Sequence, residues 1–298
     1  YSEYFRRRQI AKIVEELSEI WDLLICQTDA SKLLRNFRKL RYVLQMCLLL
    51  VTTGLCIWFM TVQFKSYNYF IIVSIYAFSS YIIAEMIINF STFVLAIWVN
   101  LKVINQILRD LDHQCDNFDK LRSMPFQNWP KIKQRTTKYS VDELKILKIS
   151  YTRLYAVSET LTSTYGVPLL GATIWIVMNS LVTFYAITTI HLVETRIYTP
   201  LIRMVCWYLN VWCFVIILCT CCQVTATECN KMIVRLHNLI LKTKFCDEFT
   251  HELKDIVSYL KNLKLEFSIC GFFRLNHSFL SAFLGFICSY IIIMLQIN

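Results

Sequence analysis

The sequence predicts an all-α membrane protein, a polytopic helical bundle whose long helices extend into a cytoplasmic anchor region. Of its 298 residues, 56% are hydrophobic and only 17% are charged, with a mean hydropathy of +0.47. A soluble domain is typically less apolar and has about a quarter of its residues charged. Stretches without any charged residue cover 42–64, 160–193, 204–227 and 275–298, and Glu85 is the single charge between Lys65 and Lys102. Each stretch exceeds the roughly 20 residues of a membrane-spanning helix, and backbone buried in lipid must be helical to satisfy its own hydrogen bonds.

We therefore expect one domain over residues 1–298 with five spans, at about 42–64, 69–98, 165–190, 202–223 and 275–297. The 31 lysines and arginines are concentrated in alternate segments: nine lie in 1–41, eleven in 102–153 and eight in 231–274. By the positive-inside rule these segments are cytoplasmic, which places the N-terminal side in the cytoplasm and the C-terminus outside the cell. The net charge of +10 then reflects membrane topology and not nucleic-acid binding. We expect a multi-pass protein of the plasma membrane.

The start of the chain has neither an initiator Met nor the pattern of a signal peptide. Residues 1–41 already have the composition of a cytoplasmic loop. We expect additional sequence upstream, including further spans.

The cytoplasmic segments, 1–41, 99–164 and 224–274, carry helical patterns. In the first segment, apolar residues recur at the spacing of one buried helix face; they are Ile10, Ile13, Val14, Leu17, Ile20, Trp21 and Leu24. Apolar spacing also continues the second span to Leu111, and a single helix over 69–111 would be about 60 Å long at 1.5 Å per residue. Pro125 and Pro130 are expected to interrupt the next segment. A further apolar stripe, from Val141 to Leu161, leads into the third span.

The last cytoplasmic segment has the most regular pattern. Its apolar residues alternate steps of four and three, which is a heptad seam; they are Phe249, Leu253, Ile256, Leu260, Leu263, Phe267 and Cys270. The seam predicts helix–helix association, either between subunits or within one subunit. Gly271 is expected to end this helix just before the final span.

The thirteen cysteines do not indicate disulfides, because they lie in the expected spans or in reducing cytoplasmic segments. Cys219, Cys221 and Cys222 cluster at the inner end of the fourth span, where they are either palmitoylation sites or small packing residues. The spacing of Cys and His residues matches no zinc motif. The sequence predicts no metal and no cofactor.

The C-terminal sequence LEFSICGFFRLNHSFLSAFLGFICSYIIIMLQIN resembles the C-terminal signature of insect gustatory receptors. That signature has a Cys-Gly-Phe-Phe-like turn followed by Leu and a polar residue, then Thr-Tyr, several apolar residues and Gln-Phe. Here Cys270 to Phe273 match the turn, Tyr290 and Gln296 match the end, and Ser289 and Ile297 replace the expected Thr and Phe. The Tyr-Gly-Val-Pro sequence at 165–168 also resembles the family. The resemblance implies a seven-span receptor related to insect odorant receptors, of which the first two spans are absent.

The resemblance further implies a ligand-gated, non-selective cation channel that detects a small-molecule tastant. Its expected partners are the tastant, membrane lipid and other gustatory receptors, with which it would form a homo- or hetero-tetramer. In that fold the last helix of each subunit meets the others at a central pore. Tyr290, Ile293 and Ile297 fall on one helix face, bordered by Gln296, so these four residues are the candidate gate. An isoleucine ring can close a pore by dewetting, and a glutamine ring offers amide dipoles when it opens. The alternative is a lipid-facing helix with Gln296 at the interface.

A tastant would arrive from outside, so we expect its pocket in the outer halves of the spans. The candidates are aromatic or polar residues of these halves, as is usual in pockets for small organic molecules: Trp58, Tyr76, Tyr81, Glu85, Tyr185, Trp207, Tyr208 and Asn210. The aromatic members are equally typical of an interfacial belt. Glu85, the sole acid well inside a span, is either a functional group or a hydrogen-bonded structural residue.

Three other classes of protein fit the sequence less well. A membrane enzyme would need paired catalytic or metal-binding residues, and the five histidines have no such spacing. A G-protein-coupled receptor would have its N-terminus outside and would carry the Asp-Arg-Tyr or Asn-Pro-x-x-Tyr motifs, which are not present here. A small-molecule transporter would show internal repeats with Gly- or Pro-broken helices, and no such repeat is visible.

Overall fold

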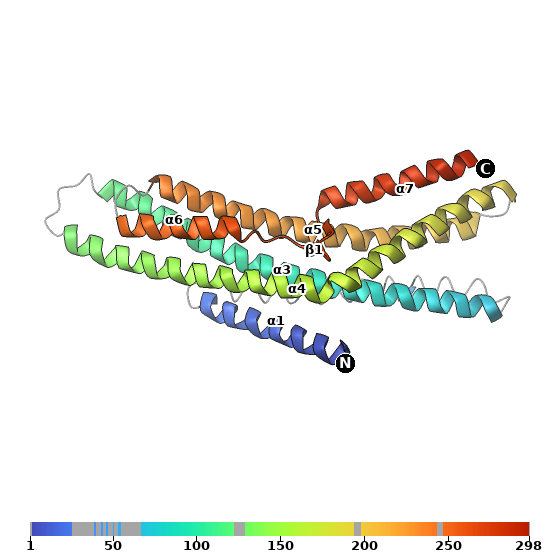
Figure 1. Cartoon of the computed structure of the whole chain (residues 1–298), viewed down its shortest axis with the longest axis horizontal. Coiled ribbons are helices and arrows are strands. Elements are labelled where there is room, and N and C mark those ends of the chain that lie inside the picture. The colour runs from blue at the N-terminus through green and yellow to red at the C-terminus, as the bar shows by residue number, and fades with distance from the viewer. Residues whose placement is uncertain are drawn as a thin grey trace. The chain divides into compact units, whose positions relative to one another are not determined.

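The computed structural model describes residues 2–25, 67–121, 129–193, 198–242 and 247–297, together with Lys39, Val43, Met46, Leu50, Thr53 and Gly54. Its helices are α1 (Ser2–Ile25), α3 (Tyr67–Leu121), α4 (Trp129–Val193), α5 (Tyr198–Lys242), α6 (Asp247–Asn262) and α7 (His277–Ile297). A two-stranded antiparallel hairpin, β1 (Ser268–Ile269) and β2 (Phe273–Arg274), lies between α6 and α7 (Figure 1). The predicted all-α class is confirmed, with this short hairpin as an addition.

Three helices in the described part of the chain are long and apolar enough to cross a membrane: Phe78–His113, Asp142–Tyr185 and Tyr208–Leu241. They lie within α3, α4 and α5, which cover the second, third and fourth expected spans. The apolar α7 covers the fifth expected span and has 21 residues. The first expected span, 42–64, lies almost wholly outside the described residues. The chain is thus a multi-pass helical membrane protein.

Two of the long helices can be compared directly with the sequence predictions, and α4 continues through Pro168 in its interior. α3 has 55 residues, which is about 80 Å at 1.5 Å per residue, and the expected helix over 69–111 is part of it. α4 begins at Trp129, so Pro130 occupies its first turn, where the missing N–H of proline does no harm.

Contacts divide the chain into two compact units. Unit 1 contains Tyr1–Arg35, Val94–Leu161 and Val224–Glu266, and unit 2 contains Asn36–Phe93, Thr162–Gln223 and Phe267–Asn298. Unit 2 therefore holds most residues of the expected spans, and unit 1 holds most residues of the expected cytoplasmic segments.

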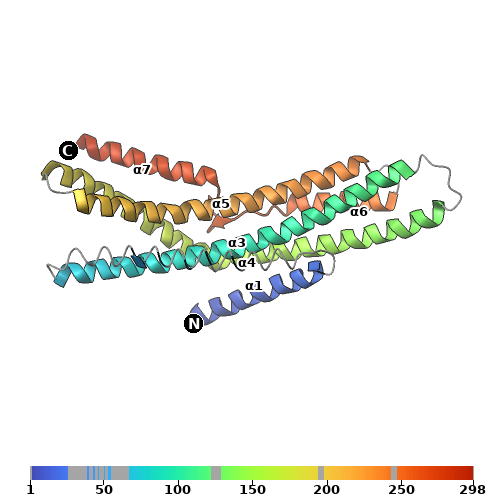
Figure 2. The ribbon, with the colours of Figure 1, turned by 180° about the vertical axis from the view of Figure 1, so that it is seen from behind.

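Unit 1 is a bundle of α1 and α6 with the adjoining parts of α3, α4 and α5. Its core contains members of the predicted apolar stripes, since Leu101, Ile104, Leu144 and Leu154 are all buried. The prediction for the first segment is wrong at Val14, which is 53% exposed although Ile13 and Ile20 are buried. α1 lies along α4 (Figure 2), and the exposed Glu19 accepts a 2.9 Å hydrogen bond from Arg153.

α6 also packs against α4 within unit 1. The amine of Lys148 lies 5.6 Å from the centre of the Tyr259 ring. Four residues of the predicted seam are buried in this bundle: Phe249, Leu253, Ile256 and Leu260. This burial is what packing within one subunit would produce.

The prediction that the heptad helix continues to Cys270 is wrong beyond the end of α6. The helix ends at Asn262, so Leu263 is only half-buried at a bend, and Phe267 belongs to an extended segment that leads into β1. Gly271, expected to end this helix, instead forms the turn of the hairpin. The reason is local: Leu265, Phe267 and Ile269 are buried while Lys264 and Glu266 are exposed, which is the alternation of a strand.

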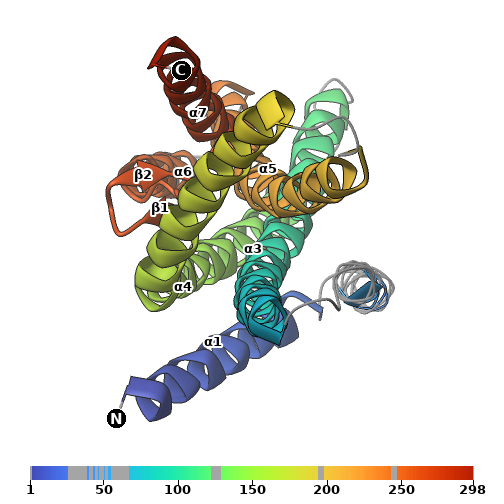
Figure 3. The ribbon, with the colours of Figure 1, turned by 90° about the vertical axis from the view of Figure 1, so that its right-hand side faces the viewer.

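The hairpin packs on the α4 part of unit 2 (Figure 3). The amide nitrogen and the Sγ atom of Cys270 both lie 3.3 Å from where a Cβ would stand on Gly166. Gly166 therefore permits a close approach that no larger residue would allow without a shift.

Candidate functional site

α7 begins at a well-defined cap. The Oδ1 atom of Asn276 accepts a 2.9 Å hydrogen bond from the backbone N–H of Phe279, and thus satisfies one of the free N–H groups of the first turn. This asparagine belongs to the C-terminal signature, and the structure gives a physical reason for a polar residue there. Sequence reasoning missed this capping role, although an Asn just before an apolar helix is a known signal.

One face of α7 packs into unit 2. Phe283 is 8% exposed and Ile287 is 2% exposed, and both lie one helical turn apart on the same face.

Of the candidate gate residues, Tyr290 lies two turns after Phe283, at the edge of the buried face, whereas Ile293 and Gln296 lie farther round the helix. Tyr290 is 37% exposed and Ile293 is 51% exposed, and Gln296 is exposed as well. Ile297 lies in the helix, but its side chain is outside the described residues. An exposed apolar face on a single chain is compatible with a pore-lining role and equally with contact to lipid.

A stripe of small and polar residues, interrupted by the exposed Ile292, lies on the side of α7 opposite its buried face, and sequence reasoning did not single it out. Its members repeat at steps of three, four or seven residues and are all exposed: Ser278, Ser281, Gly285, Ser289 and Gln296. The hydroxyl of Ser281 donates to the carbonyl of His277 at 3.2 Å, and that of Ser289 donates to the carbonyl of Gly285 at 2.9 Å. Each hydroxyl oxygen can still accept a hydrogen bond, so this face of α7 suits contact with water.

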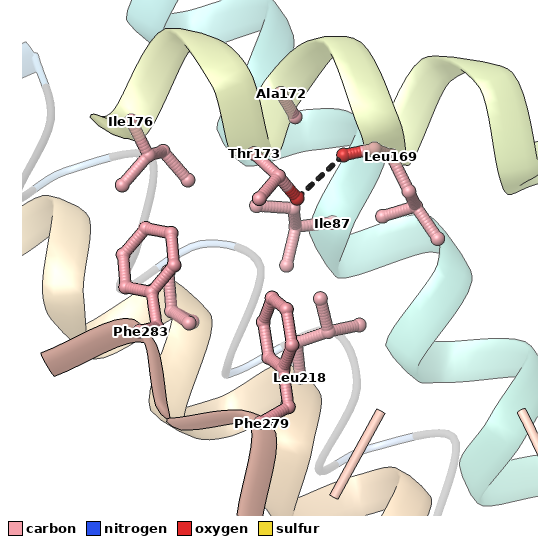
Figure 4. A pocket seen from close by; sticks show the side chains of 9 residues that line it. Ile87, Leu169, Ala172, Thr173, Ile176, Leu218, Phe279 and Phe283 are labelled. Carbon is pink, nitrogen blue, oxygen red and sulfur yellow. Dashed lines mark hydrogen bonds between the residues drawn. The ribbon is translucent and has the colours of Figure 1, made fainter. Parts of the chain in front are cut away.

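A small apolar pocket lies behind the buried face of α7, in unit 2 (Figure 4). Phe279 and Phe283 of α7 close one side, and α3, α4 and α5 supply the other walls; the remaining lining residues are Ile87, Leu169, Ala172, Thr173, Ile176, Val215 and Leu218. The hydroxyl of Thr173 donates to the carbonyl of Leu169 at 2.8 Å. The free space is about 10 Å³, about enough for one water molecule. In this conformation the pocket cannot hold a molecule of tastant size, which needs several hundred Å³.

A series of aromatic rings in unit 2 connects the C-terminal part of α4 to α7. Phe184 lies 5.2 Å from Tyr208, Tyr208 lies 5.8 Å from Trp212, and Trp212 lies 5.4 Å from Phe283, all measured between ring centres. From Phe283 the series continues to Phe279 at 5.8 Å. These edge-to-face and tilted contacts each contribute about 0.5–1.5 kcal/mol beyond burial.

The same series reaches the hairpin, because Phe273 lies 5.9 Å from Phe279. Four elements of unit 2, namely α4, α5, α7 and β2, are thus joined by consecutive ring contacts.

The structure places the ligand candidates unevenly. Tyr208 is the candidate within the aromatic series, where it is half-buried. Tyr81 is 37% exposed and Tyr185 is 52% exposed, and Asn210 is half-buried. The small pocket behind α7 includes none of the eight candidates.

Three candidates fall outside what the structure describes. Trp58 is not described, and the side chains of Tyr76 and Trp207 are not described although their backbones belong to α3 and α5. Glu85 is half-buried, and its Oε1 accepts a 3.1 Å hydrogen bond from the amide of Asn89 one turn later in α3. This bond is compatible with the structural role that the sequence left open.

Three cysteines in the middle of α5 are packing residues in this structure. Cys219 is 0%, Cys222 is 1% and Cys221 is 8% exposed, and palmitoylation would require an accessible thiol. No group of three or more His, Cys, Asp or Glu residues in the described ranges could hold a metal ion.

The whole chain, residues 1–298, matches the family described as 7tm chemosensory receptor. No curated protein matches the sequence. Two solved structures of the insect olfactory receptor OR5 from Machilis hrabei are similar in fold. The first is 14% identical, with a TM-score of 0.56, and the alignment covers 97% of this chain and 80% of that one. The second, a complex with eugenol, is 14% identical with a TM-score of 0.57, and the alignment covers 98% of this chain and 70% of that one.

Proposed function

Because the chain belongs to the 7tm chemosensory receptor family, we propose that it is a gustatory receptor, a subunit of a ligand-gated, non-selective cation channel in the plasma membrane. The choice of taste over smell rests on the C-terminal signature, in which Cys270, Gly271, Tyr290 and Gln296 match the gustatory pattern. The proposed ligand is a small-molecule tastant. The OR5 structure with eugenol supports a small organic ligand for proteins of this fold.

The exposed surface of α7 is the single observation that carries the channel proposal. An apolar helix that only spans lipid needs no polar face, yet α7 combines the exposed apolar residues Tyr290 and Ile293 with an exposed stripe that includes Ser281, Ser289 and Gln296. Four copies of α7 around an axis would place the apolar residues as a closed ring and the polar stripe beside the water path. Rings of apolar side chains close pores by dewetting, and polar rings conduct.

The aromatic series supplies a physical connection between ligand and gate. In this proposal a tastant binds among the outer aromatic residues, with Tyr208 as one of its contacts. Movement of Tyr208 would be transmitted through Trp212 to Phe283 on the buried face of α7. Because a packed interior is bistable and does not deform continuously, a small shift at the ligand can move α7 between two packings.

The proposed orientation has unit 1 in the cytoplasm and the C-terminus of α7 outside. Its support is the distribution of basic residues. The boundaries between the two units lie within about ten residues of the boundaries between the basic segments and the charge-free spans.

The test is current recording from cells that express the receptor, while a panel of sugars and bitter compounds is applied to them. Ile293→Ala should raise the current without ligand several-fold, because a smaller ring dewets less completely. Leu284→Ala is the matched control, since Leu284 is 43% exposed and lies nine residues away, on the opposite side of α7. If both variants stay silent at rest while responding normally to ligand, Ile293 is not the gate. Absence of ligand-evoked current from protein that has reached the cell surface would contradict the channel function itself.

A further inference from the structure

Two exposed phenylalanines mark the hairpin that precedes α7. Phe272 is 75% exposed and Phe273 is 50% exposed. Adjacent phenylalanines are rarely left in water, because burying such a side chain is worth about 1.5–3 kcal/mol. An exposed apolar pair of this kind indicates a surface that is covered by something other than water.

The exposure of these rings is fixed by the backbone. Cys270 and Gly271 both have positive φ angles, 49° and 74°, the pattern of the type I′ turn that closes tight hairpins. The N–H of Phe272 donates to the carbonyl of Ile269 at 2.9 Å, and the N–H of Leu275 donates to that of Phe267 at 2.9 Å. These bonds hold the turn closed.

The other side of the hairpin is buried. Ile269 is 0% exposed, and Phe267 and Leu275 are each 3% exposed. Phe272 lies in the turn at the end of the hairpin, and Phe273, which pairs with Ile269, lies at the exposed edge of the core-facing side.

The position of the hairpin along the chain places it at a membrane surface. Arg274 is the last charged residue of the sequence, and α7 begins three residues later. The 21 residues of α7 span about 32 Å at 1.5 Å per residue, close to the thickness of the hydrocarbon core. The N-terminal end of α7, and with it the hairpin, must then lie at the boundary between acyl chains and headgroups.

We propose that the hairpin is a lipid-binding anchor, in which Phe272 and Phe273 insert at this boundary and Arg274 binds the phosphate of an anionic phospholipid. Aromatic side chains favour this depth of the bilayer, and the guanidinium fork of arginine suits a phosphate group. Arg274 is exposed and follows Phe273 directly in the chain, with its side chain on the other face of β2. A surface that is apolar within and cationic at its rim complements an anionic leaflet better than it complements a second basic copy of this chain.

The anchor would bear directly on the start of α7. Phe273 lies 5.9 Å from Phe279, a ring in the first turn of α7 that also lines the small pocket. Lipid bound at the hairpin would therefore steady this turn. The proposal requires that α7 cross the membrane, but not that it line a pore, so it can succeed or fail independently of the channel function.

The experiment measures the depth of residue 272 in the bilayer. The full chain carrying Phe272→Trp is reconstituted in vesicles of phosphatidylcholine and phosphatidylserine, with and without brominated acyl chains that quench nearby tryptophan. The chain already has seven tryptophans, so the parent protein supplies the background. The control is Val234→Trp, which adds a tryptophan at a 58% exposed site of unit 1.

We expect bromolipid to quench the emission added by Phe272→Trp and to leave that added by Val234→Trp unchanged. The proposal would be overturned if bromolipid quenched the emission added at residue 272 no more than the emission added at residue 234. If quenching at residue 272 is absent and Phe272→Ala also lowers the number of subunits per particle, the exposed side of the hairpin is an interface between copies of the chain.

A second measurement tests the phosphate contact. Phosphatidylserine should raise the thermal midpoint of the parent protein above its value in phosphatidylcholine alone, because a ligand that binds the folded state stabilises it. Arg274→Gln should lose most of this increase, with each variant's increase measured from its own midpoint in phosphatidylcholine. If the Gln variant gains as much from phosphatidylserine as the parent does, Arg274 does not bind the headgroup.

Discussion

At the scale of single residues, Tyr151 is the clearest case of a polar group that organises unit 1. The ring is fully buried, and its hydroxyl donates a 2.6 Å hydrogen bond to the carbonyl of Leu263, just after α6. The same hydroxyl lies 3.2 Å from the thiol of Cys229 in α5. One atom thus joins α4, α5 and the segment that follows α6. A partly buried carbonyl that loses its donor carries a cost of desolvation, so this contact should matter for stability.

We predict that Tyr151→Phe lowers the stability of the folded protein by about 1–2 kcal/mol, because it leaves the Leu263 carbonyl without its donor. The measurement is the thermal midpoint of the purified receptor. Tyr259→Phe is the control, since the side chain of Tyr259 is 36% exposed and surface changes typically stay within about 0.5 kcal/mol. Equal midpoints for the two variants would show that the buried hydroxyl contributes nothing specific.

At the scale of elements, the contact between α4 and the hairpin depends on the absence of a side chain. A Cβ on Gly166 would meet the backbone and sulfur of Cys270 at 3.3 Å, whereas a Cβ on Gly171, in the same helix, would meet nothing within 4 Å. Replacing a helical glycine by alanine normally stabilises a helix by roughly 0.5–1 kcal/mol. The two glycines should therefore respond in opposite directions.

We predict that Gly171→Ala raises the thermal midpoint and that Gly166→Ala lowers it. In the second variant the turn at Cys270 has to shift, and its strained positive φ angle leaves it little freedom to do so. The Gly171 variant serves as the internal control for helix propensity. A Gly166 variant that is as stable as the Gly171 variant would mean that the hairpin is not held against α4.

The elements also show what could be predicted from the sequence. Charge-free stretches and apolar periodicity predict α3, α4, α5 and α7, because helix formation in lipid follows from composition. The hairpin was missed because Phe267 and Cys270 continue the heptad spacing of α6, while the competing alternation of Leu265, Phe267 and Ile269 is short. A count of matches to both periods would have found the strand signal.

The pocket and the aromatic series were beyond prediction for a different reason. The rings of the series come from three helices and lie up to a hundred positions apart in the sequence; they are Phe184, Tyr208, Trp212 and Phe283. Periodicity indicates which face of a helix is buried, but not which residue of another helix it meets. The exposed stripe of α7 could have been predicted from the sequence, since Ser281, Gly285 and Ser289 are spaced four residues apart.

At the scale of the whole molecule, the proposed channel needs more than one chain. α7 exposes Leu284, Phe286, Ile292 and Ile293 at 43–56% each, so several of its sides are open on a single subunit. A closed ring of identical contacts is the usual way for such a surface to be covered.

We predict that the purified receptor forms particles of four chains, measured by mass photometry in mild detergent. The physical reason is that lining a central pore with α7 requires a cyclic arrangement. Particles that contain a single chain at concentrations where ligand-evoked current is observed would contradict the tetramer.

The serine hydroxyls of α7 have a consequence for how this helix moves. Ser281 and Ser289 are bonded to carbonyls of α7 itself, so these two bonds accompany the helix when it turns about its long axis. Resistance to such a turn would come chiefly from the bulky rings of Phe279 and Phe283, which must exchange one set of neighbours for another. The speed of opening would then depend on ring size at these two positions more than on the strength of any directional bond.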